Sequence, residues 1–315
     1  MKLHKKNNGG SNVEKSKNGI VNKLLYSKKI APYVFVLPFI ITFLVFFIYP
    51  IITTITMSFQ NVAPQGQTQF IGLTNYKNLL NTHFYTALWN SFRYTFWTLL
   101  ILVPIPIILA VFLNSKKLVG KKFFRAALFV PVLTSVVVAG IVFRLIFGES
   151  AGSPFNTSIA MFGFSPQAWI RDGKYAMTLM VSLAVWTWMG INIIYFLSGL
   201  QNIPNELYES ANIDGAGPIA QFVYITMPML KPVIIYVLTI SIFAGLSMFT
   251  QSYVFWSNDS PQDSGLTIVG YLYQQGFQTS NWGLASAIGI VLLIIVLTLN
   301  LIQLKMFGLF DEGVE

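Results

Sequence analysis

Cysteine is absent from this chain of 315 residues, and histidine occurs only twice. Without a thiol the chain can form no disulfide bond, no thiolate metal site and no cysteine nucleophile. Charged residues are also scarce, at 10% of the chain, and no Asp, Glu or His falls in the middle of a long apolar run. Ion-coupled secondary transporters usually carry such a residue inside a span. That class is therefore disfavoured, and it is kept as an alternative.

Groups that could perform catalysis are few and dispersed. His4 lies in a polar N-terminal stretch, His83 is isolated in a polar connection, and no glycine-rich phosphate loop occurs. A membrane-embedded enzyme of the glycosyltransferase type, the second alternative, would need acids clustered at one membrane interface. The acids of the polar connections are scattered instead: Glu149, Asp172, Asp259 and Asp263. We predict no catalytic site, no metal site and no cofactor bound by this chain.

Long apolar runs dominate the sequence, which is 54% hydrophobic. Six of them are long enough to cross hydrocarbon, which takes about 20 helical residues. They cover residues 31–57, 90–114, 124–147, 176–200, 232–256 and 283–307. Their continuous apolar character excludes the alternating strands of a membrane barrel. We predict an all-α membrane protein of about six transmembrane helices, with one transmembrane domain over residues 30–310 and kinks at Pro104, Pro106 and Pro131.

Lys and Arg residues are distributed unequally between the two faces that six spans would define. One face holds the Lys-rich tail of residues 1–29, the connection at residues 116–125, Lys231 and Lys305, whereas the opposite face holds few. The positive-inside rule then places both termini in the cytoplasm, including the C-terminal tail of residues 311–315. The net charge of +9 indicates this topology and an attraction to anionic membrane lipid, rather than binding of nucleic acid.

The connection between the fourth and fifth runs, residues 202–232, is too polar to cross a membrane and would face the cytoplasm. Pro204 suits the first turn of a helix. Residues at helical spacing follow it: Leu207, Ala211 and Asp214. Gly215 can adopt the positive φ at which such a helix stops. A second short helix should run from about Pro218 until Pro228, giving a compact helix–turn–helix on the membrane surface.

This connection resembles the cytoplasmic motif of binding-protein-dependent ABC importer permeases, which has Glu-Ala-Ala, then Gly, then a distal Leu/Met-Pro. The matching positions are Glu209, Ser210, Ala211, Asp214, Gly215, Ala216, Ile225, Met227 and Pro228. Ser210 stands where Ala is commoner, which exchanges one small residue for another. The resemblance implies a coupling helix that docks in a groove of an ATPase subunit. Leu207 on the same helix either joins that contact or packs back on the permease.

Further residues resemble the maltose-type carbohydrate branch of this family. They are Gly72, Leu73, Asn75, Tyr76, Asn90, Tyr94, Phe129, Pro131, Ser135, Trp188, Gly190, Gly283, Ala285, Ser286 and Ala287. One departure is the sequence SNDSP at residues 257–261, where many relatives have an Asn-Gly-Gly-Pro turn, so the shape of that outer loop is left open. The resemblance implies a second homologous permease, two ATPase subunits that bind ATP and Mg²⁺, and an extracellular sugar-binding protein.

Neutral polar and aromatic residues in the fourth and fifth runs could form a sugar path, because sugars bind by aromatic stacking combined with hydrogen bonds. The candidates are Trp188, Gly190, Asn192, Phe243, Ser247 and Gln251. Each could instead hold neighbouring helices together, as polar side chains do in membranes. The sequence thus predicts a multi-pass permease subunit of an ATP-driven sugar importer in a bacterial plasma membrane.

The predicted topology can be tested by labelling single cysteines, since the chain has none of its own. We expect Lys117→Cys and Asp214→Cys to be protected from a membrane-impermeant thiol reagent in intact cells, and Arg171→Cys to react. Labelling of either protected position from outside, without permeabilisation, would overturn the cytoplasmic placement of both connections.

Overall fold

The computed structural model describes residues 28–62, 68–115 and 118–308, and it consists of two units, Met1–Thr56 and Met57–Glu315. The described part of the first unit is one helical run: α2 (Ala31–Phe43), the π-helical turn η1 (Leu44–Ile48) and α3 (Tyr49–Ser58), whose last two residues belong to the second unit. No described side chain of the first unit is buried. Residues 1–27 of the predicted tail, and the tail at 311–315, lie outside the described residues.

The second unit is built from long helices joined by short ones. The long runs are α5 (Thr82–Leu102) with α6 (Pro104–Asn114), α7 (Lys121–Phe129) with the 3-10 turn η2 (Val130–Leu133) and α8 (Val136–Ile146), α10 (Ala176–Gln201), α14 (Lys231–Leu246) with α15 (Thr250–Trp256), and α17 (Trp282–Met306). The short elements are α4 (Thr74–Asn78), α9 (Pro154–Ala160), η3 (Gly173–Tyr175), α11 (Asn205–Ile213), α12 (Pro218–Gln221), η4 (Phe222–Thr226), α13 (Met227–Met229), η5 (Pro261–Asp263), α16 (Ile268–Tyr273) and η6 (Gln274–Gln278). Within the described residues the strands are β1 (Gln60–Val62) and β2 (Thr68–Phe70), which pair antiparallel with Asn61 opposite Gln69.

The predicted all-α membrane fold is confirmed. In the described part of the chain, five helices are long and apolar enough to cross a membrane, and a sixth span results if α7–η2 and α8 are counted together. These two segments are bent by 96° at the break that follows Pro131, a site where the sequence predicts a kink. The second span starts earlier than predicted, at Thr82, because the Asn81 side chain caps the helix by accepting a hydrogen bond from the Phe84 N–H at 2.9 Å.

The fifth predicted span, residues 232–256, is found at Lys231–Trp256, but its helix is interrupted. Helix α14 ends at Leu246, and α15 begins only at Thr250. Phe249 between them has φ −135° and ψ −54°, outside the helical region. The span therefore consists of two helical segments with irregular backbone between them.

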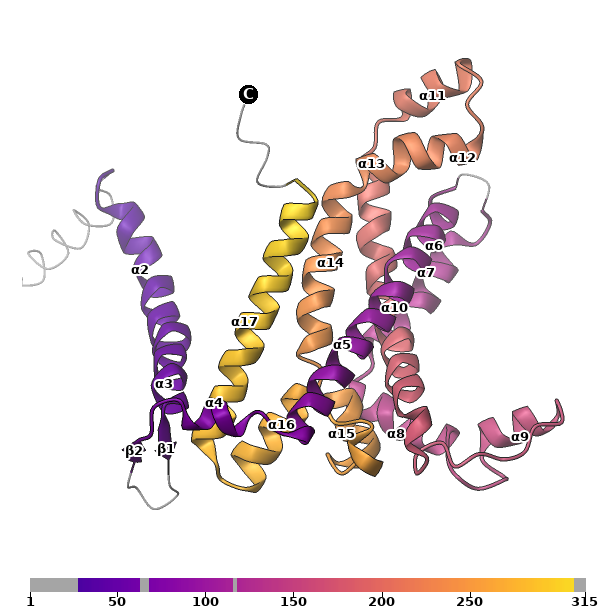
Figure 1. Ribbon diagram of the computed structural model, residues 1–315. Coiled ribbons are helices and arrows are strands. Elements are labelled where there is room, and N and C mark those ends of the chain that lie inside the picture. The colour runs from indigo at the N-terminus through magenta and orange to yellow at the C-terminus, as the bar shows by residue number, and fades with distance from the viewer. Residues whose placement is uncertain (1–27, 63–67, 116–117, 309–315) are drawn as a thin grey trace, which may run out of the picture. The chain divides into compact units, whose positions relative to one another are not determined.

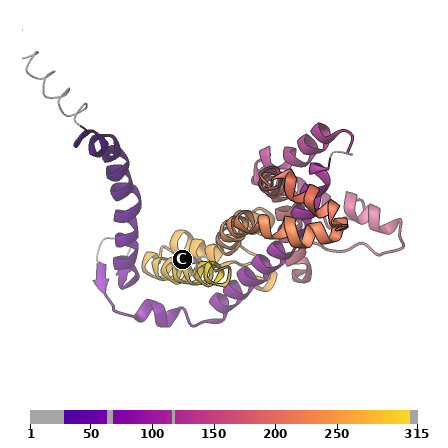
Figure 2. The ribbon, with the colours of Figure 1, turned by 90° about the horizontal axis from the view of Figure 1, so that it is seen from above.

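The elements of the second unit are arranged as the predicted sidedness requires. Figure 1 shows α11–α13, the C-terminal end of α6, the start of α7 and the C-terminal end of α17 at one end of this unit, with α9, α15 and α16 at the other. Seen from above, α14 and α17 stand side by side (Figure 2) and are in contact. Which of the two ends faces the cytoplasm stays a prediction.

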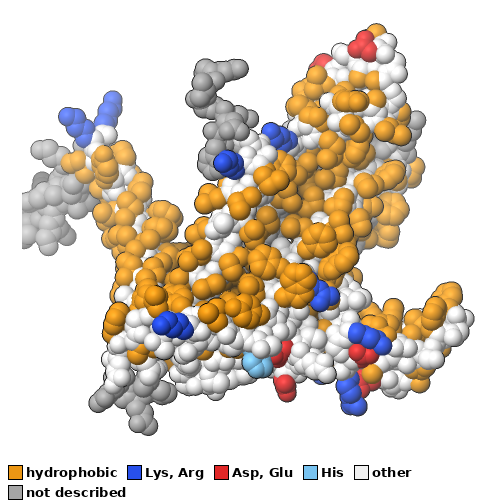
Figure 3. Space-filling view, in the orientation of Figure 1, with side chains coloured by type: hydrophobic (Ala, Val, Ile, Leu, Met, Phe, Trp, Pro, Cys, Tyr) orange, Lys and Arg blue, Asp and Glu red, His pale blue; other side chains and the backbone are white. Residues whose placement is uncertain are grey.

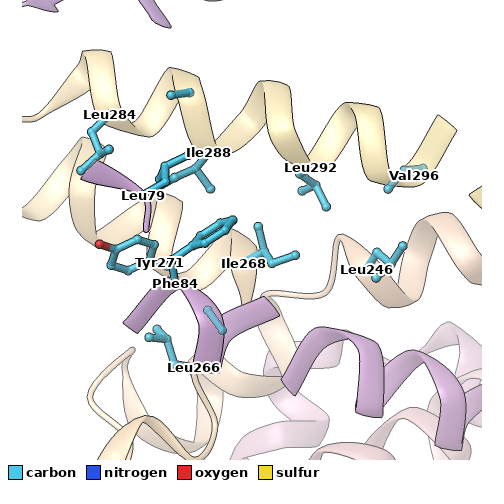
Figure 4. Packing of buried hydrophobic residues seen from close by; sticks show 12 residues of the cluster. Leu79, Phe84, Leu246, Leu266, Ile268, Tyr271, Leu284, Ile288, Leu292 and Val296 are labelled. Atoms are coloured by element: carbon cyan, nitrogen blue, oxygen red, sulfur yellow. The ribbon is translucent and has the colours of Figure 1, made fainter. Parts of the chain in front are cut away.

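Buried apolar side chains form three clusters in the second unit. The first joins α5, α16 and α17, and in it Phe84 lies between Ile268 and Ile288 (Figure 4). The second centres on α10, α8 and α15, and the third on α6, α10 and the start of α14. Helix α10 contributes to both of these clusters, with Met180 at 0% and Phe196 at 0% exposure. Helix α10 thus lies in the interior of the unit and packs against α5, α6, α7, α8, α14 and α15.

Glycine permits the closest helix approach in this unit. A Cβ added at Gly190 on α10 would lie 2.0 Å from the Leu128 carbonyl oxygen of α7 and 3.1 Å from the Phe129 Cα. Both neighbours are backbone atoms, which cannot turn aside as a side chain can. Small residues serve this purpose in membrane helices generally. Gly190 is therefore a packing residue between α10 and α7.

We expect Gly190→Ala to destabilise the helical unit by about 1–3 kcal/mol, the usual range for overpacking, because backbone must move to accept one methyl group. Gly217→Ala is the matched control: its φ is −71°, and an added Cβ there meets nothing within 4 Å. Thermal unfolding of the detergent-purified transporter should show a lower midpoint for Gly190→Ala alone. Equal midpoints for the two variants would show that α7 and α10 are not packed this closely.

Candidate functional site

A cavity of about 390 Å³ lies among α5, α10 and the junction of α14 with α15. Its described lining combines aromatic rings with neutral hydrogen-bonding groups and aliphatic side chains: Tyr94, Thr98, Leu102, Val136, Ala184, Trp188, Ile191, Asn192, Tyr195, Ile240, Ser241, Ala244, Gly245, Ser247, Met248, Phe249, Thr250 and Gln251. No Asp, Glu, Lys, Arg or His is among these residues. Such a lining suits an uncharged polar molecule, since a charged one would be left without a counter-charge.

Four of the six residues predicted for the sugar path line this cavity: Trp188, Asn192, Ser247 and Gln251. Gly190 and Phe243 do not line it. Gly190 faces the backbone of α7, and the Phe243 side chain is 59% exposed on another face of α14. Their place on the sugar path stays a prediction that the lining of this cavity does not support. A helix that is apolar all round gives no periodic signal for which face looks into a cavity.

The sequence analysis did not select six further polar or aromatic residues of the lining for the sugar path: Tyr94, Thr98, Tyr195, Ser241, Phe249 and Thr250. Tyr94 and Thr98 are four residues apart on α5, so they lie on one helix face. Tyr195 lies three residues after Asn192 on α10, and this helical spacing from a recognised candidate was the signal that could have identified it.

One wall of the cavity is fixed where proline interrupts the backbone ladder of the second span. Pro106 has no N–H, so the carbonyl of Leu102, four residues earlier, loses its helical partner. The Asn192 side chain supplies the missing donor, with Nδ2 at 2.8 Å from the Leu102 oxygen. Asn192 is only 4% exposed. Its amide therefore joins α10 to the break between α5 and α6 while it borders the cavity.

The opposite wall is fixed at the break between α14 and α15. The hydroxyl of Thr267, which is fully buried, donates to the carbonyl of Met248 at 2.8 Å. The Thr267 Oγ1 also accepts a hydrogen bond from the Gly270 N–H and thereby caps α16. Gly245 lets the end of α14 approach α5, since an added Cβ would lie 2.6 Å from the Thr95 Oγ1. The irregular backbone of residues 247–249 is thus held from two sides.

The ion pairs among the described residues involve side chains that do not line the cavity. Arg171 pairs with Glu149 at 3.4 Å, Lys174 with Asp172 at 2.9 Å, and His83 with Asp263. The hydrogen bond from the Lys174 ammonium lowers the pKa of the Asp172 carboxyl below its ordinary value. These pairs are largely exposed and contribute little to stability.

The outer loop at SNDSP has a defined shape although it lacks the glycines of many relatives. Ser257 has φ 51° and Asn258 has φ 72°, so both take the left-handed conformation that glycine favours. Asn tolerates this conformation better than most residues. The buried Asn258 side chain donates to the carbonyl of Gly270 at 2.8 Å. The main-chain carbonyl of Asn258 accepts from the Gln274 side chain. Asn258 thereby connects the end of α15 to α16 and η6.

The second candidate region is the polar connection formed by α11, α12, η4 and α13. Gly215 has φ 76°, as predicted for the end of the first short helix. The Ala216 N–H donates to the Ala211 carbonyl at 2.8 Å, and the Gly215 N–H to the Asn212 carbonyl at 3.1 Å. This pair of bonds is the Schellman arrangement that ends a helix at a left-handed residue. The second helical stretch starts at Pro218 and continues through Pro228, as expected.

Three side-chain hydrogen bonds brace the connection internally. Gln221 donates to the Asn212 side chain at 2.7 Å and to the Ala216 carbonyl at 2.9 Å. Tyr208 and Thr226 share a hydrogen bond of 2.8 Å between α11 and the end of η4. The sequence analysis singled out neither pair, because the two partners of each lie 9 and 18 residues apart.

The outer surface of the connection is acidic and apolar. Its acids, Glu206, Glu209 and Asp214, are all exposed, and Figure 3 shows acidic side chains at the far tip of the projection. Ile213 is 87% and Ile219 81% exposed, and neither was among the predicted contact residues. Of the predicted ones, Leu207 is 41% exposed, Ser210 and Pro228 are exposed, and Ala211 and Ala216 are half-buried. Exposed apolar side chains beside acids are typical of a surface that another protein covers.

The fold and the two regions define a helical membrane protein with a cavity among its helices and a braced connection that projects from one end. Comparison with known proteins identifies the family of the chain. Residues 102–315 match the family described as "Binding-protein-dependent transport system inner membrane component". The chain belongs to this family of ABC importer permeases, which confirms the predicted family and the inner-membrane location. Members of the family are transport components rather than enzymes, and they work in systems with a binding protein.

Individual relatives share nearly the whole length of the chain. It is 58% identical over 291 residues to the arabinooligosaccharides transport system permease protein AraP of Bacillus subtilis, with coverage of 92% of this chain and 93% of the relative. The protein of the same name from Halalkalibacterium halodurans is 50% identical over 287 residues, covering 91% and 90%. A bacterial ABC transporter involved in the import of the acidic polysaccharide alginate contains a chain of the same fold, with a TM-score of 0.78, 24% identity and coverage of 93% and 98%.

The left-handed turn at Gly215 generates a steric prediction. Gly215→Val should strain the turn by about 1–2 kcal/mol and re-aim the helix that carries Glu209, although an added Cβ clashes with nothing within 4 Å. We expect less ATPase retained on the membrane and slower transport, with normal insertion. Gly215→Asn is the matched control, because Asn accepts positive φ. Normal transport by the Val variant, or a failure of insertion, would contradict the role assigned to this turn.

Proposed function

We propose that this chain is one of two homologous permease subunits of an ATP-driven importer for a neutral sugar or oligosaccharide. The observation that carries the proposal is the cavity lining, which offers aromatic rings, hydroxyls and amides but, within the described residues, no ionisable acid or base. Sugars present apolar C–H faces together with hydroxyl groups, and this combination matches such a lining. An acidic polysaccharide would call for Lys or Arg in the lining, and none is present there.

The relatives named above narrow the substrate class. Two chains that are 58% and 50% identical to this one carry the name of an arabinooligosaccharide transport system. We therefore propose an arabinose-containing oligosaccharide as substrate, delivered by an extracellular binding protein. Trp188, Asn192, Ser247 and Gln251 would contact it. Asn192 already uses one amide hydrogen on the Leu102 carbonyl, which leaves its remaining hydrogen-bonding capacity for the substrate.

The projecting connection supplies the coupling to ATP in this proposal. Its helix α11, with Glu209, Ser210, Ala211 and Asp214, would dock in a groove of an ATPase subunit, and the exposed Ile213 and Ile219 would supply apolar contact. Two ATPase subunits, one on each permease, would bind ATP and Mg²⁺. A carboxylate that becomes partly desolvated in such a groove contributes more than one in open water.

Transport would proceed by alternating access. Closure of the two ATPase subunits would push the coupling connections, which rock the helices and open the cavity outward to receive sugar. Hydrolysis would reset the inward-facing state. The ion-coupled alternative lacks support, because such transporters use an intramembrane ionisable group and the cavity lining contains none.

The proposal is tested by the complete transporter, reconstituted with its binding protein and supplied with ATP. Uptake of arabino-oligosaccharides that depends on ATP, and that is insensitive to collapse of ion gradients, is the expected result. Uptake driven by an ion gradient without ATP would reject the proposal in favour of secondary transport.

Two tryptophans on α10 provide a matched pair for testing the cavity. Trp188 lines it with 40% exposure, whereas Trp186, at 39%, does not. Trp188→Ala should raise the KM for sugar uptake about tenfold, the equivalent of roughly 1.4 kcal/mol of lost stacking. Trp186→Ala should leave the KM near the wild-type value. If the two variants behave alike, Trp188 does not contact the substrate.

A further inference from the structure

Five aromatic side chains form a contiguous strip on the outer connections of the second unit. The strip comprises Phe249, Tyr253, Tyr273, Phe277 and Trp282, which come from the α14–α15 junction, α15, α16, η6 and the start of α17. Ring centroids lie 5.2 Å apart from Phe249 to Tyr273, 5.3 Å from Tyr273 to Phe277 and 4.9 Å from Phe277 to Trp282. Tyr253 lies beside the inner end, 5.0 Å from Phe249 and 5.7 Å from Tyr273.

The strip is continuous with the cavity, because Phe249 belongs to both. Its members are only partly buried, and Phe277 near the outer end is 61% exposed. A hydrophobic core would bury these rings, as it does Phe255, which is 1% exposed. The strip thus leads from the cavity along the outer connections as an accessible aromatic surface.

The surroundings of the strip favour a carbohydrate over a lipid chain. No charged residue occurs between Asp263 and Lys305. Neutral hydrogen-bonding side chains interrupt the aromatic ones along this stretch: Gln274, Gln275, Gln278, Thr279, Ser280 and Asn281. Aromatic rings also form the interfacial belts of membrane proteins. Here they are interspersed with amides and hydroxyls, a combination that matches the C–H faces and rim hydroxyls of a sugar. The two tyrosine hydroxyls of the strip add to this capacity.

We infer that the aromatic strip is a second binding surface that holds the sugar units of an oligosaccharide that extend beyond the cavity. This inference rests on the proposed function, and it names chain length as the property that the strip recognises. A disaccharide would occupy the cavity alone, whereas a tetrasaccharide would also stack on Phe277 and Tyr273. The strip would therefore favour longer substrates over shorter ones.

The inference is tested with the complete reconstituted transporter and its binding protein, using α-1,5-linked arabinobiose and arabinotetraose as probes. Phe277→Leu keeps apolar bulk and removes the aromatic face. It should lower kcat/KM for the tetrasaccharide about fivefold to tenfold and leave the disaccharide value nearly unchanged. Phe277→Tyr should restore selectivity for the longer probe. Phe164→Leu, which alters another exposed outer aromatic residue with 66% exposure, is the control.

Several outcomes would overturn the inference. An equal loss for both probes, or no loss, would show that the strip does not read chain length. Loss of another subunit from purified Phe277→Leu transporter would show that the strip is a protein contact. If the wild-type transporter takes up neither probe, the proposed substrate fails as well. If the wild type takes up both and Phe277→Leu leaves their ratio unchanged, only the strip is rejected.

Discussion

Every backbone carbonyl inside the membrane must find a donor, and the cavity exists because this requirement is met at two broken helices. Hydrocarbon offers no water to an unpaired carbonyl. Asn192 supplies the donor for Leu102 where Pro106 cannot, and Thr267 supplies it for Met248 at the end of α14. Without these bonds the irregular segments would straighten or collapse together. The polar groups that satisfy the backbone also give the cavity and its surroundings their hydrogen-bonding character.

Close packing around the breaks depends on small residues. Gly190 brings α10 onto the backbone of α7, Gly245 brings α14 onto Thr95, and Gly140 brings α8 onto Val254 of α15. At each position an added Cβ would lie within 2.6 Å of its neighbour. Apolar burial does not drive association between helices in lipid, so such contacts and interhelical hydrogen bonds hold the bundle together. The cavity is the volume that these approaches leave unfilled.

The sequence predicted the features that have local causes. Long apolar runs identified the spans, Pro131 marked the bend of the third one, and Gly215 marked the end of α11, because length, a missing N–H and a positive φ each act within a few residues. The break at residues 247–249 contains no proline, and the hydroxyl that satisfies its Met248 carbonyl comes from Thr267, 19 residues away. The absence of Phe243 from the cavity lining has a related reason, since the orientation of its side chain depends on packing between helices rather than on its neighbours in sequence.

The proposed coupling connection and the cavity are joined by helices that follow one another along the chain. The chain is helical from Pro218 to Met229 and, after a turn at Leu230, again from Lys231 to Leu246, directly before Ser247 on the cavity wall. Gln221 and the Tyr208–Thr226 pair stiffen its outer end, so a force on α11 would not dissipate within the connection. After α14 the next non-helical backbone is the 247–249 segment, in which the Met248 carbonyl accepts a hydrogen bond from Thr267. A tilt of α14 would therefore be absorbed at that segment, where Ser247 and Phe249 border the cavity. In the proposed mechanism, α14 would therefore link the connection that receives the push to the part of the cavity wall that contacts sugar.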